Sequence, residues 1–320
     1  MNRRQTTHRV LYSFLPRAQC WPNGPRFFIA VNLVGTLLVT AAIVSTNHPN
    51  AANAANALVL DDLVGTPSPA EPSGMSPPAV NALAGYTRSY VSDFNNRSLP
   101  AGWFVFYGVP GGDPGGHFGL KHVRVGGGLL QLTTWRDPAY QNQWVTGGLC
   151  QCSVGQIYGA YFVRSRITGP GPNEVQLLWP ITNHWPPEID FNETGAKDMS
   201  TSSTLHYGPT NLMNHHHLRI DMTKWHTWGV IWTATAVIYV VDGTRWAVDT
   251  NPSQIPHVRM RLDFEQRAMC SLHKQCPNLP QAMYVDWVAE YVRTPTPSTE
   301  TTTMGVTGST TLTTAQPTAP

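Results

Sequence analysis

Three carboxylic acids fall within six residues of the sequence, Glu188-Ile-Asp-Phe-Asn-Glu193. On a regular β-strand, residues 188, 190 and 192 share one face, and Ile189 and Phe191 point to the other. Glu193 would then lie on the apolar side. A β-bulge accommodates one extra residue, and bulges are common beside active sites. With a bulge, Glu188, Asp190 and Glu193 line one surface.

Three acids on one face repel one another, so the cluster needs a chemical reason. Metal binding is one reason. The other is glycosidic cleavage, in which a nucleophile and a proton donor stand roughly 5–5.5 Å apart when the configuration is retained. Asp190 then shares a proton or a hydrogen bond with its neighbour, and this makes the pKa values of the clustered acids differ. A solvated edge strand carrying acidic side chains is the purely structural alternative.

Two tryptophans flank the acids, Trp179 and Trp185. Aromatic faces stack on the apolar faces of sugar rings, so both are candidates for substrate binding, with a place in the core as the alternative. Asn214-His-His-His217 carries metal-ligating side chains but is interpreted as a surface loop. Gly111–His117 is a turn-rich loop that could rim a cleft. No metal site is assigned.

The elements that must position these residues are strands. Residues 160–168 and 285–292 alternate between apolar and other side chains, and Asp242-Gly243 between two apolar runs is a strong hairpin signal. No stretch of a dozen residues keeps a helical period. Many short strands with Gly and Pro turns predict an all-β fold, an antiparallel β-sandwich.

The acidic segment resembles the E-[I/L]-D-x-x-E signature of glycoside hydrolase family 16, in its bulged, laminarinase-like version. The resemblance extends over about residues 94–292, and the family's usual order is kept. The similar segments are Gly159-Ala-Tyr-Phe-Val-Arg164, Leu177-Leu-Trp-Pro180, Leu205-His-Tyr-Gly208, Trp225-His-Thr-Trp-Gly-Val-Ile-Trp232, Val241-Asp-Gly243 and Met283-Tyr-Val-Asp-Trp-Val288.

This resemblance implies a concanavalin A-like jelly roll with an open substrate cleft on the concave sheet. It implies that Glu188 is the nucleophile, Asp190 the assisting acid and Glu193 the general acid/base, and it places His206 beside the acid/base. No cofactor is required. Relatives often carry a structural calcium ion near the chain ends, and Asp93 or Asp286 could contribute to one here.

Four cysteines lie in the predicted β-sandwich: Cys150, Cys152, Cys270 and Cys276. An even number suggests two disulfides outside the cytoplasm. Cys270–Cys276 would close a short loop and is the first expectation. Cys150 and Cys152 then remain for each other, which is geometrically awkward, so cross-pairing stays open.

The composition divides the chain into four parts. Residues 1–57 are basic and contain a charge-free stretch, 27–46, which predicts a signal peptide or a retained membrane anchor. Residues 58–85 are Pro-rich and predict an extended, mobile linker. Residues 86–293 form the expected catalytic β-sandwich, and 294–320 a Thr-rich disordered tail.

The net charge of +2 comes from the first 26 residues, which hold five Arg and no acid; the rest has 16 Lys and Arg against 19 Asp and Glu, a charge of −3. Such a balance excludes a nucleic-acid-binding basic domain. We expect a monomer, secreted or in the cell envelope, that contacts a membrane only through its N-terminal segment.

The expected function is an exported endo-acting glycosidase that acts with retention on a β-linked polysaccharide, most simply β-1,3-glucan. Two alternatives use the same fold. One is a transglycosylase that remodels wall polysaccharide with the same residues. The other is a carbohydrate-binding module without catalytic activity, which the presence of all three acids disfavours.

Overall fold

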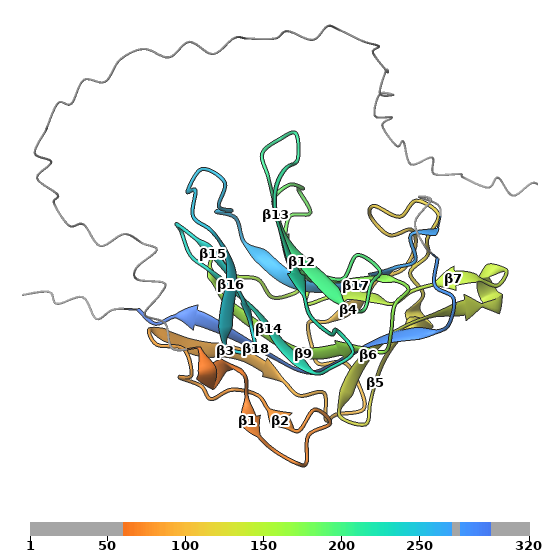
Figure 1. The fold of residues 1–320 in the computed structure, drawn as a ribbon, viewed down its shortest axis with the longest axis horizontal. Coiled ribbons are helices and arrows are strands. Elements are labelled where there is room, and N and C mark those ends of the chain that lie inside the picture. The colour runs from red at the N-terminus through yellow and green to blue at the C-terminus, as the bar shows by residue number, and fades with distance from the viewer. Residues whose placement is uncertain (1–59, 271–275, 296–320) are drawn as a thin grey trace, which may run out of the picture. The chain divides into compact units, whose positions relative to one another are not determined.

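The computed structural model describes residues 60–270 and 276–295, and these residues form two antiparallel sheets packed face to face (Figure 1). The predicted N-terminal segment 1–57 and the tail from residue 296 lie outside the described residues. Within the described ranges, no helix is long and apolar enough to cross a membrane.

The first sheet has seven strands in the order β13-β12-β11-β10-β17-β8-β4. Their bounds are β4 Phe104–Val105, β8 Gly148–Cys150, β10 Asn173–Pro180, β11 Glu188–Glu193, β12 Ser200–Tyr207, β13 Leu212–Arg219 and β17 Met260–Arg267.

The second sheet has nine strands. Seven follow the order β16-β15-β14-β9-β18-β6-β5, while β3 pairs with β18 and β7 with β6. Their bounds are β3 Tyr86–Ser92, β5 Val123–Gly126, β6 Leu129–Asp137, β7 Gln143–Val145, β9 Gly159–Ile167, β14 His226–Trp232, β15 Val237–Val241, β16 Thr244–Asp249 and β18 Gln281–Arg293. The described residues also include a separate two-stranded sheet of β1 Thr66–Pro67 and β2 Met75–Ser76, and the short 3₁₀ helices η1 Asp61–Leu63, η2 Leu120–His122 and η3 Pro138–Tyr140.

The main core fills the space between the two sheets. Ile189, Phe191 and Leu205 of the seven-stranded sheet and Trp228 and Val285 of the nine-stranded sheet are fully or almost fully buried there. Because every second residue of a strand points inward, the alternating pattern places the intervening residues of β11 on the outer face of its sheet. The predicted all-β sandwich is thereby confirmed.

The predicted hairpin at Asp242-Gly243 is present between β15 and β16. Both residues have positive φ, 46° and 75°. This is the conformation that a two-residue type I′ turn demands, which explains the Asp-Gly pair.

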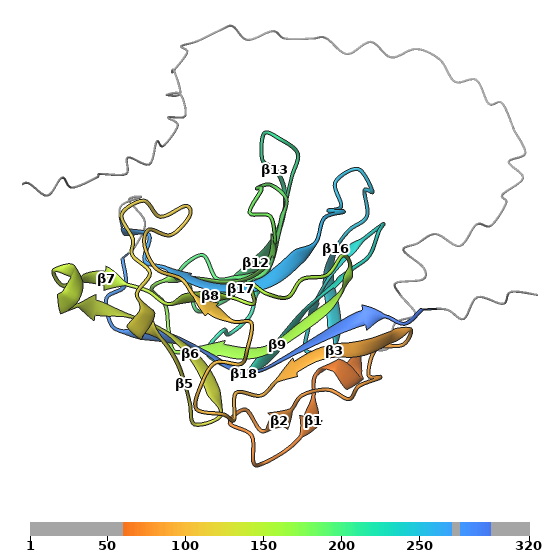
Figure 2. The same cartoon turned by 180° about the vertical axis from the view of Figure 1, so that it is seen from behind.

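The prediction of an extended linker at residues 58–85 is wrong for its described part. Leu60, Leu63 and Leu83 are buried in a second apolar cluster against the outer face of the nine-stranded sheet, and β1 and β2 lie beneath that sheet in both ribbon views (Figures 1 and 2). Trp287 Nε1 donates to the carbonyl of Met75 at 2.9 Å. The segment is ordered because the outer face of the nine-stranded sheet is apolar.

Strands β9, β14 and β18 carry large apolar side chains on both faces. Phe162, Ile231, Trp287 and Tyr291 point away from the main core and would be exposed without a cover. The 60–85 segment supplies that cover, and its prolines are compatible with an ordered, irregular backbone once its leucines are buried.

Two disulfides stabilise the described chain, Cys150–Cys152 and Cys270–Cys276. The first expectation for the pairing therefore holds, and the cross-paired alternative does not.

Candidate active site

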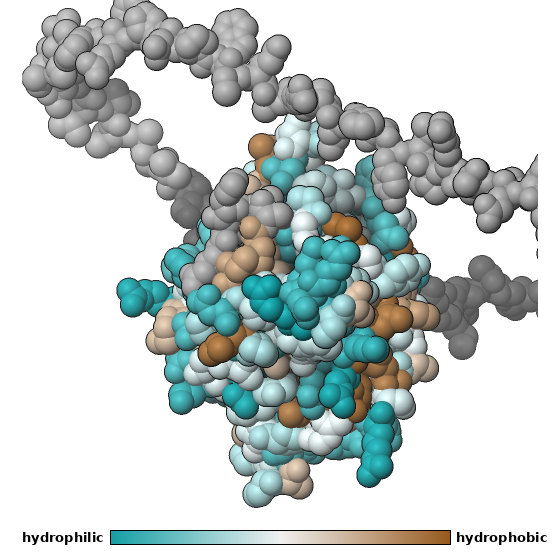
Figure 3. Space-filling model, turned by 90° about the vertical axis from the view of Figure 1, so that its right-hand side faces the viewer, coloured by the Kyte–Doolittle hydropathy of each residue, from teal (hydrophilic) through white to brown (hydrophobic). Residues whose placement is uncertain are grey.

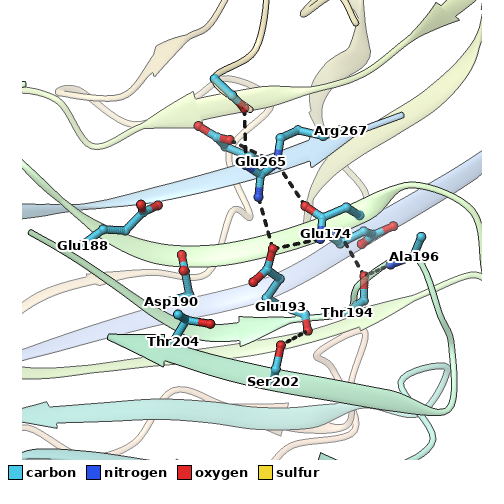
Figure 4. Close-up of polar contacts among 12 residues, drawn as sticks. Glu174, Glu188, Asp190, Glu193, Thr194, Ala196, Ser202, Thr204, Glu265 and Arg267 are labelled. Atoms are coloured by element: carbon cyan, nitrogen blue, oxygen red, sulfur yellow. Dashed lines mark hydrogen bonds and ion pairs between the residues drawn. The ribbon is translucent and has the colours of Figure 1, made fainter. Parts of the chain in front are cut away.

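The strand that carries the three acids has the predicted bulge. Asp190 pairs with Thr204 of β12 and Glu193 with Ser202, so three residues on β11 oppose two on β12, and the register shifts between them. The shift turns Glu193 to the same side as Glu188 and Asp190, and Figure 4 shows the three acids along β11. The bulge predicted from the sequence is confirmed.

A cleft of about 710 Å³ lies on this outer face. Its lining comes from five neighbouring strands, β13, β12, β11, β10 and β17, so its long direction crosses the strands. Gly111 and Gly112 also contribute, as expected for a loop that rims the cleft. All six predicted site residues line it: Trp179, Trp185, Glu188, Asp190, Glu193 and His206.

The indole of Trp185 holds Glu188 directly. Trp185 Nε1 donates to Glu188 Oε2 at 2.7 Å, and the tryptophan remains 41 % exposed. Burial, followed by the charge of Asp190, raises the pKa of Glu188 to about 8, against the lowering effects of His206, Trp185 and Arg267. Glu188 therefore shares a protonation equilibrium with its neighbours.

The half-buried His206 lies beside the buried Asp190 and opposite Glu188, so the expectation that it lies beside the acid/base Glu193 is wrong. His206 Nε2 lies 3.1 Å from Asp190 Oδ2, and its Nδ1 lies 2.7 Å from Asn211 Oδ1. Burial raises the pKa of Asp190, although the hydrogen bond and charge of His206 oppose this. Burial lowers the pKa of His206, but Asp190, Glu188 and Asn211 outweigh it and raise that pKa to about 9. The charges of Asp190 and Glu188 therefore favour the protonated form of His206.

Two side chains contact the same carboxylate oxygen of Glu193. Its Oε1 accepts a hydrogen bond from Asn173 Nδ2 at 3.0 Å and lies 3.3 Å from an Arg267 terminal nitrogen (Figure 4). Arg267 Nε in turn donates to Asn173 Oδ1 at 3.0 Å. Because both donors reach the same oxygen, Glu193 Oε2 is left without either of these contacts.

Strand β17 contributes a row of four charged side chains that were not predicted from the sequence. Arg261, Asp263, Glu265 and Arg267 alternate with apolar or amide residues and all line the cleft. Arg261 pairs with Asp263 at 3.0 Å and Arg267 with Glu265 at 3.9 Å. Burial raises the pKa of Glu265 to about 7. The strict alternation of charge along residues 261–267 was the signal that could have identified this row.

The histidine segment at 214–217 is an edge strand, β13, and the surface-loop interpretation is wrong. His215 lines the cleft with Met213, and its Nδ1 lies 3.1 Å from Thr204 Oγ1. His216 points the other way and contacts Asp249 at 3.1 Å. Alternate side chains of a strand face opposite sides, so consecutive histidines cannot act as one ligand group here.

Metal binding remains an alternative use of the acids. One ligand atom from each of Glu188, Asp190 and His206 lies within 4.8 Å of the other two. In the structure these groups bond to one another or to Trp185, which gives the acids partners without a metal. The structural calcium ion stays a prediction; of its two candidates, Asp286 accepts a hydrogen bond from Ser73 N at 3.0 Å.

Comparisons with known proteins agree with this geometry. The model of glycosyl hydrolases family 16 matches residues 119–287, more than half of the chain. No curated protein matches the chain.

Solved structures share the fold at low sequence identity. The laminarinase from Rhodothermus marinus is 19% identical with a TM-score of 0.58, and the alignment covers 66% of this chain and 98% of that one. The laminarinase catalytic domain from Thermotoga petrophila is 17% identical with a TM-score of 0.55, covering 66% and 99%. A Bacteroides ovatus family 16 protein, solved with a mixed-linkage glucan product, is 18% identical with a TM-score of 0.54, covering 63% and 99%.

The family match spans the bulged strand, most residues that line the cleft and strands of both sheets. The chain belongs to glycosyl hydrolase family 16.

Proposed function

We propose that this chain is an exported, endo-acting β-glucanase that cleaves β-1,3-glucan with retention of configuration. The observation that carries the proposal is the bulge in β11, which brings Glu188 and Glu193 to one face of an open cleft. An open cleft crossing several strands suits a polymer that is bound in the middle of its chain. The similar structures from Rhodothermus marinus and Thermotoga petrophila are laminarinases, which supports β-1,3-glucan as the first substrate to test.

In the proposed mechanism Glu188 attacks the anomeric carbon while Glu193 protonates the leaving oxygen through Oε2. The C–O bond to the leaving sugar breaks and a glycosyl ester of Glu188 forms. Glu193, now a carboxylate, takes a proton from water, and the resulting attack frees the sugar and restores both acids.

The assisting role of Asp190 follows from its second oxygen. Asp190 Oδ1 is buried and has no hydrogen-bond partner among the described residues. We infer that this free oxygen holds the proton shared by Glu188 and Asp190 when Glu188 attacks. Glu188 is then ionised and ready to attack, and the His206 cation balances the remaining charge.

Export is supported by two observations. The described chain holds two disulfides, which are typical of proteins outside the cytoplasm, and the charge-free stretch at 27–46 follows a basic start.

We propose a monomer: on the face shown in Figure 3, polar residues predominate and the hydrophobic residues form only small groups.

The test is a panel of laminarin, mixed-linkage glucan, agarose and arabinogalactan, with released reducing ends measured for the wild type and Glu188→Gln. Laminarin should release reducing ends only with the wild type. NMR of the first product should show the β-configuration, and an inverted product would refute the nucleophile assignment. A product longer than the starting oligosaccharide would favour the transglycosylase. Binding without release of sugar would favour a carbohydrate-binding module.

A further inference from the structure

A second pocket of about 540 Å³ lies beside the cleft, and Trp185 lines both. Three chain segments form it: the segment before β11, the turn after β12 and the connection between β16 and β17. Its lining residues are His184, Trp185, Pro186, Pro187, Tyr207, Gly208, Pro209 and residues 253–258.

The pocket lies to the side of the cleft. The cleft crosses the strands, whereas the three segments that form the pocket all lie at one end of them. Strand β11 begins at Glu188, which pairs with His206 near the end of β12, and β17 begins at Met260, which pairs with Pro180 at the end of β10. The two cavities meet at Trp185, which contacts Glu188, so a polymer bound at Glu188 lies next to this pocket.

The lining is chemically different from that of the cleft. Two arginines and five acids line the cleft, whereas the pocket has no Asp, Glu, Lys or Arg in its lining. Trp185 and Tyr207 offer aromatic rings, and four prolines add apolar faces. A neutral sugar combines apolar ring faces with hydroxyl groups and suits such a lining.

The polar groups of the pocket are held in place by neighbours. Gln254 Nε2 donates to Tyr207 OH at 2.9 Å, while Gln254 Oε1 accepts from Asn214 Nδ2 at 2.9 Å. His257 Nδ1 lies 2.7 Å from Tyr158 OH. These contacts orient donors and acceptors before a ligand arrives, which favours specific binding.

We propose that this pocket binds a short neutral sugar branch of the polysaccharide whose main chain lies in the cleft. The proposal rests on the proposed function and narrows its substrate class to branched β-glucans. The branch leaves the main chain close to the sugar attacked by Glu188, with Trp185 between the branch and the main chain.

The experiment compares linear β-1,3-gluco-oligosaccharides with matched ones that carry a single β-1,6-linked glucose. It uses the wild type, Val258→Trp and Ser253→Trp. Val258 and Ser253 are exposed residues of the pocket wall, so a tryptophan there fills the pocket without disturbing the core. The matched control is Val80→Trp, which is also exposed but lies on the segment covering the other sheet.

The wild type should cleave a branched oligosaccharide with a higher kcat/KM than the linear one. Each pocket-filling variant should lower kcat/KM for the branched substrate by about tenfold and leave the linear substrate unchanged, as Val80→Trp should for both. An unchanged ratio of branched to linear rates in both filled variants would overturn the proposal. So would a loss confined to long linear substrates, because the pocket would then hold main chain.

A binding measurement separates this proposal from the proposed function. Calorimetry with Glu188→Gln, alone and combined with Val258→Trp, reports affinity without turnover. If the wild type cleaves neither substrate, the β-glucanase assignment fails, but tighter binding of the branched oligosaccharide that Val258→Trp abolishes would still support the pocket. Equal affinity for branched and linear oligosaccharides would refute it.

Discussion

The indole nitrogen of Trp185 lies 2.7 Å from Oε2 of Glu188. Trp185, which the sequence suggests as a stacking residue, thus also donates a hydrogen bond to the proposed nucleophile. That bond lowers the pKa of Glu188 and opposes the effect of burial. In the proposed function, Trp185 therefore serves both the binding of the polymer and the ionisation of the acid that attacks it.

Trp185→Phe should keep an aromatic face but remove the N–H donor. Because the carboxylate of Glu188 loses this bond, we expect its pKa to rise and kcat to fall by about tenfold at neutral pH. KM should change less than kcat. Steady-state kinetics on laminarin from pH 5 to 9 checks this, with Trp179→Phe as the control, since within the described part of the chain Trp179 Nε1 donates to Asn183 rather than to an acid. Equal losses in the two variants would contradict the specific role of the Trp185 bond.

Replacing His206 should move the pH profile. Its charge lowers the pKa values of both Glu188 and Asp190. His206→Gln removes that charge, both pKa values rise, and the acidic limb of kcat/KM moves to higher pH. The same profile measured for His217→Gln, an exposed histidine on β13, should match the wild type. An acidic limb that stays in place in His206→Gln would show that this cation does not tune the acids.

Arg267 is expected to position Glu193. Arg267→Gln weakens the contacts to Glu193 Oε1 and to Asn173, so the proton on Oε2 is presented less well and kcat on laminarin should fall by about a hundredfold. An aryl glycoside with a good leaving group needs little protonation and should lose much less. Arg267→Lys, which keeps the charge, should recover part of the activity. Equal losses on both substrates would indicate a structural defect instead.

Glu174 should make the protein less stable as the pH rises. Gln266 Nε2 donates to its Oε1 at 3.0 Å, and burial raises its pKa from 4.5 to about 8. The folded state therefore binds more protons than the unfolded state between these values, and the free energy of unfolding falls there by up to about 1.4 kcal/mol per pH unit for this group.

Glu174→Gln removes that contribution, so its stability relative to the wild type should increase from pH 5 to pH 8 and be constant below pH 4. Urea unfolding at several pH values measures the difference. Asp62→Asn, which changes an exposed acid, is the control. A difference that does not vary with pH would contradict the protonation argument.

Leu63 tests the cover over the nine-stranded sheet. It is fully buried against that sheet, so Leu63→Ala should lower the free energy of unfolding by about 2–5 kcal/mol. Val80→Ala, in the same segment but half exposed, should change it by less than about 0.5 kcal/mol. If Leu63→Ala is as mild as Val80→Ala in urea unfolding, the segment is a dispensable appendage.

Short sequence patterns were enough to predict the hairpin and the bulge, because each depends on a few consecutive residues. Asp242-Gly243 predicted a hairpin because few other pairs tolerate positive φ at both turn positions. The spacing of Glu188, Asp190 and Glu193 predicted a bulge because no regular strand puts all three on one face. Neither inference needs to know which segment lies beside the strand.

The role of the charged row on β17 and the order of residues 60–85 depend on segments that are distant in the sequence. Arg267 on β17 reaches Glu193 on β11 because only one strand, β10, lies between them in the sheet. This strand order cannot be read from two positions that are 74 residues apart in the sequence. The prolines of 60–85 indicate a mobile segment when read alone. The segment is ordered because Phe162, Trp287 and Tyr291 leave an apolar face that must be buried.

The sequence by itself determined the fold class, the acids and the bulge that brings them together, since alternation along a strand and the geometry of a turn are local properties. Only the tertiary structure decided which groups hold those acids, what covers the second sheet and where a second pocket opens beside Trp185. Those features arise from long-range strand order and from the burial of surfaces that meet only after the two sheets have packed.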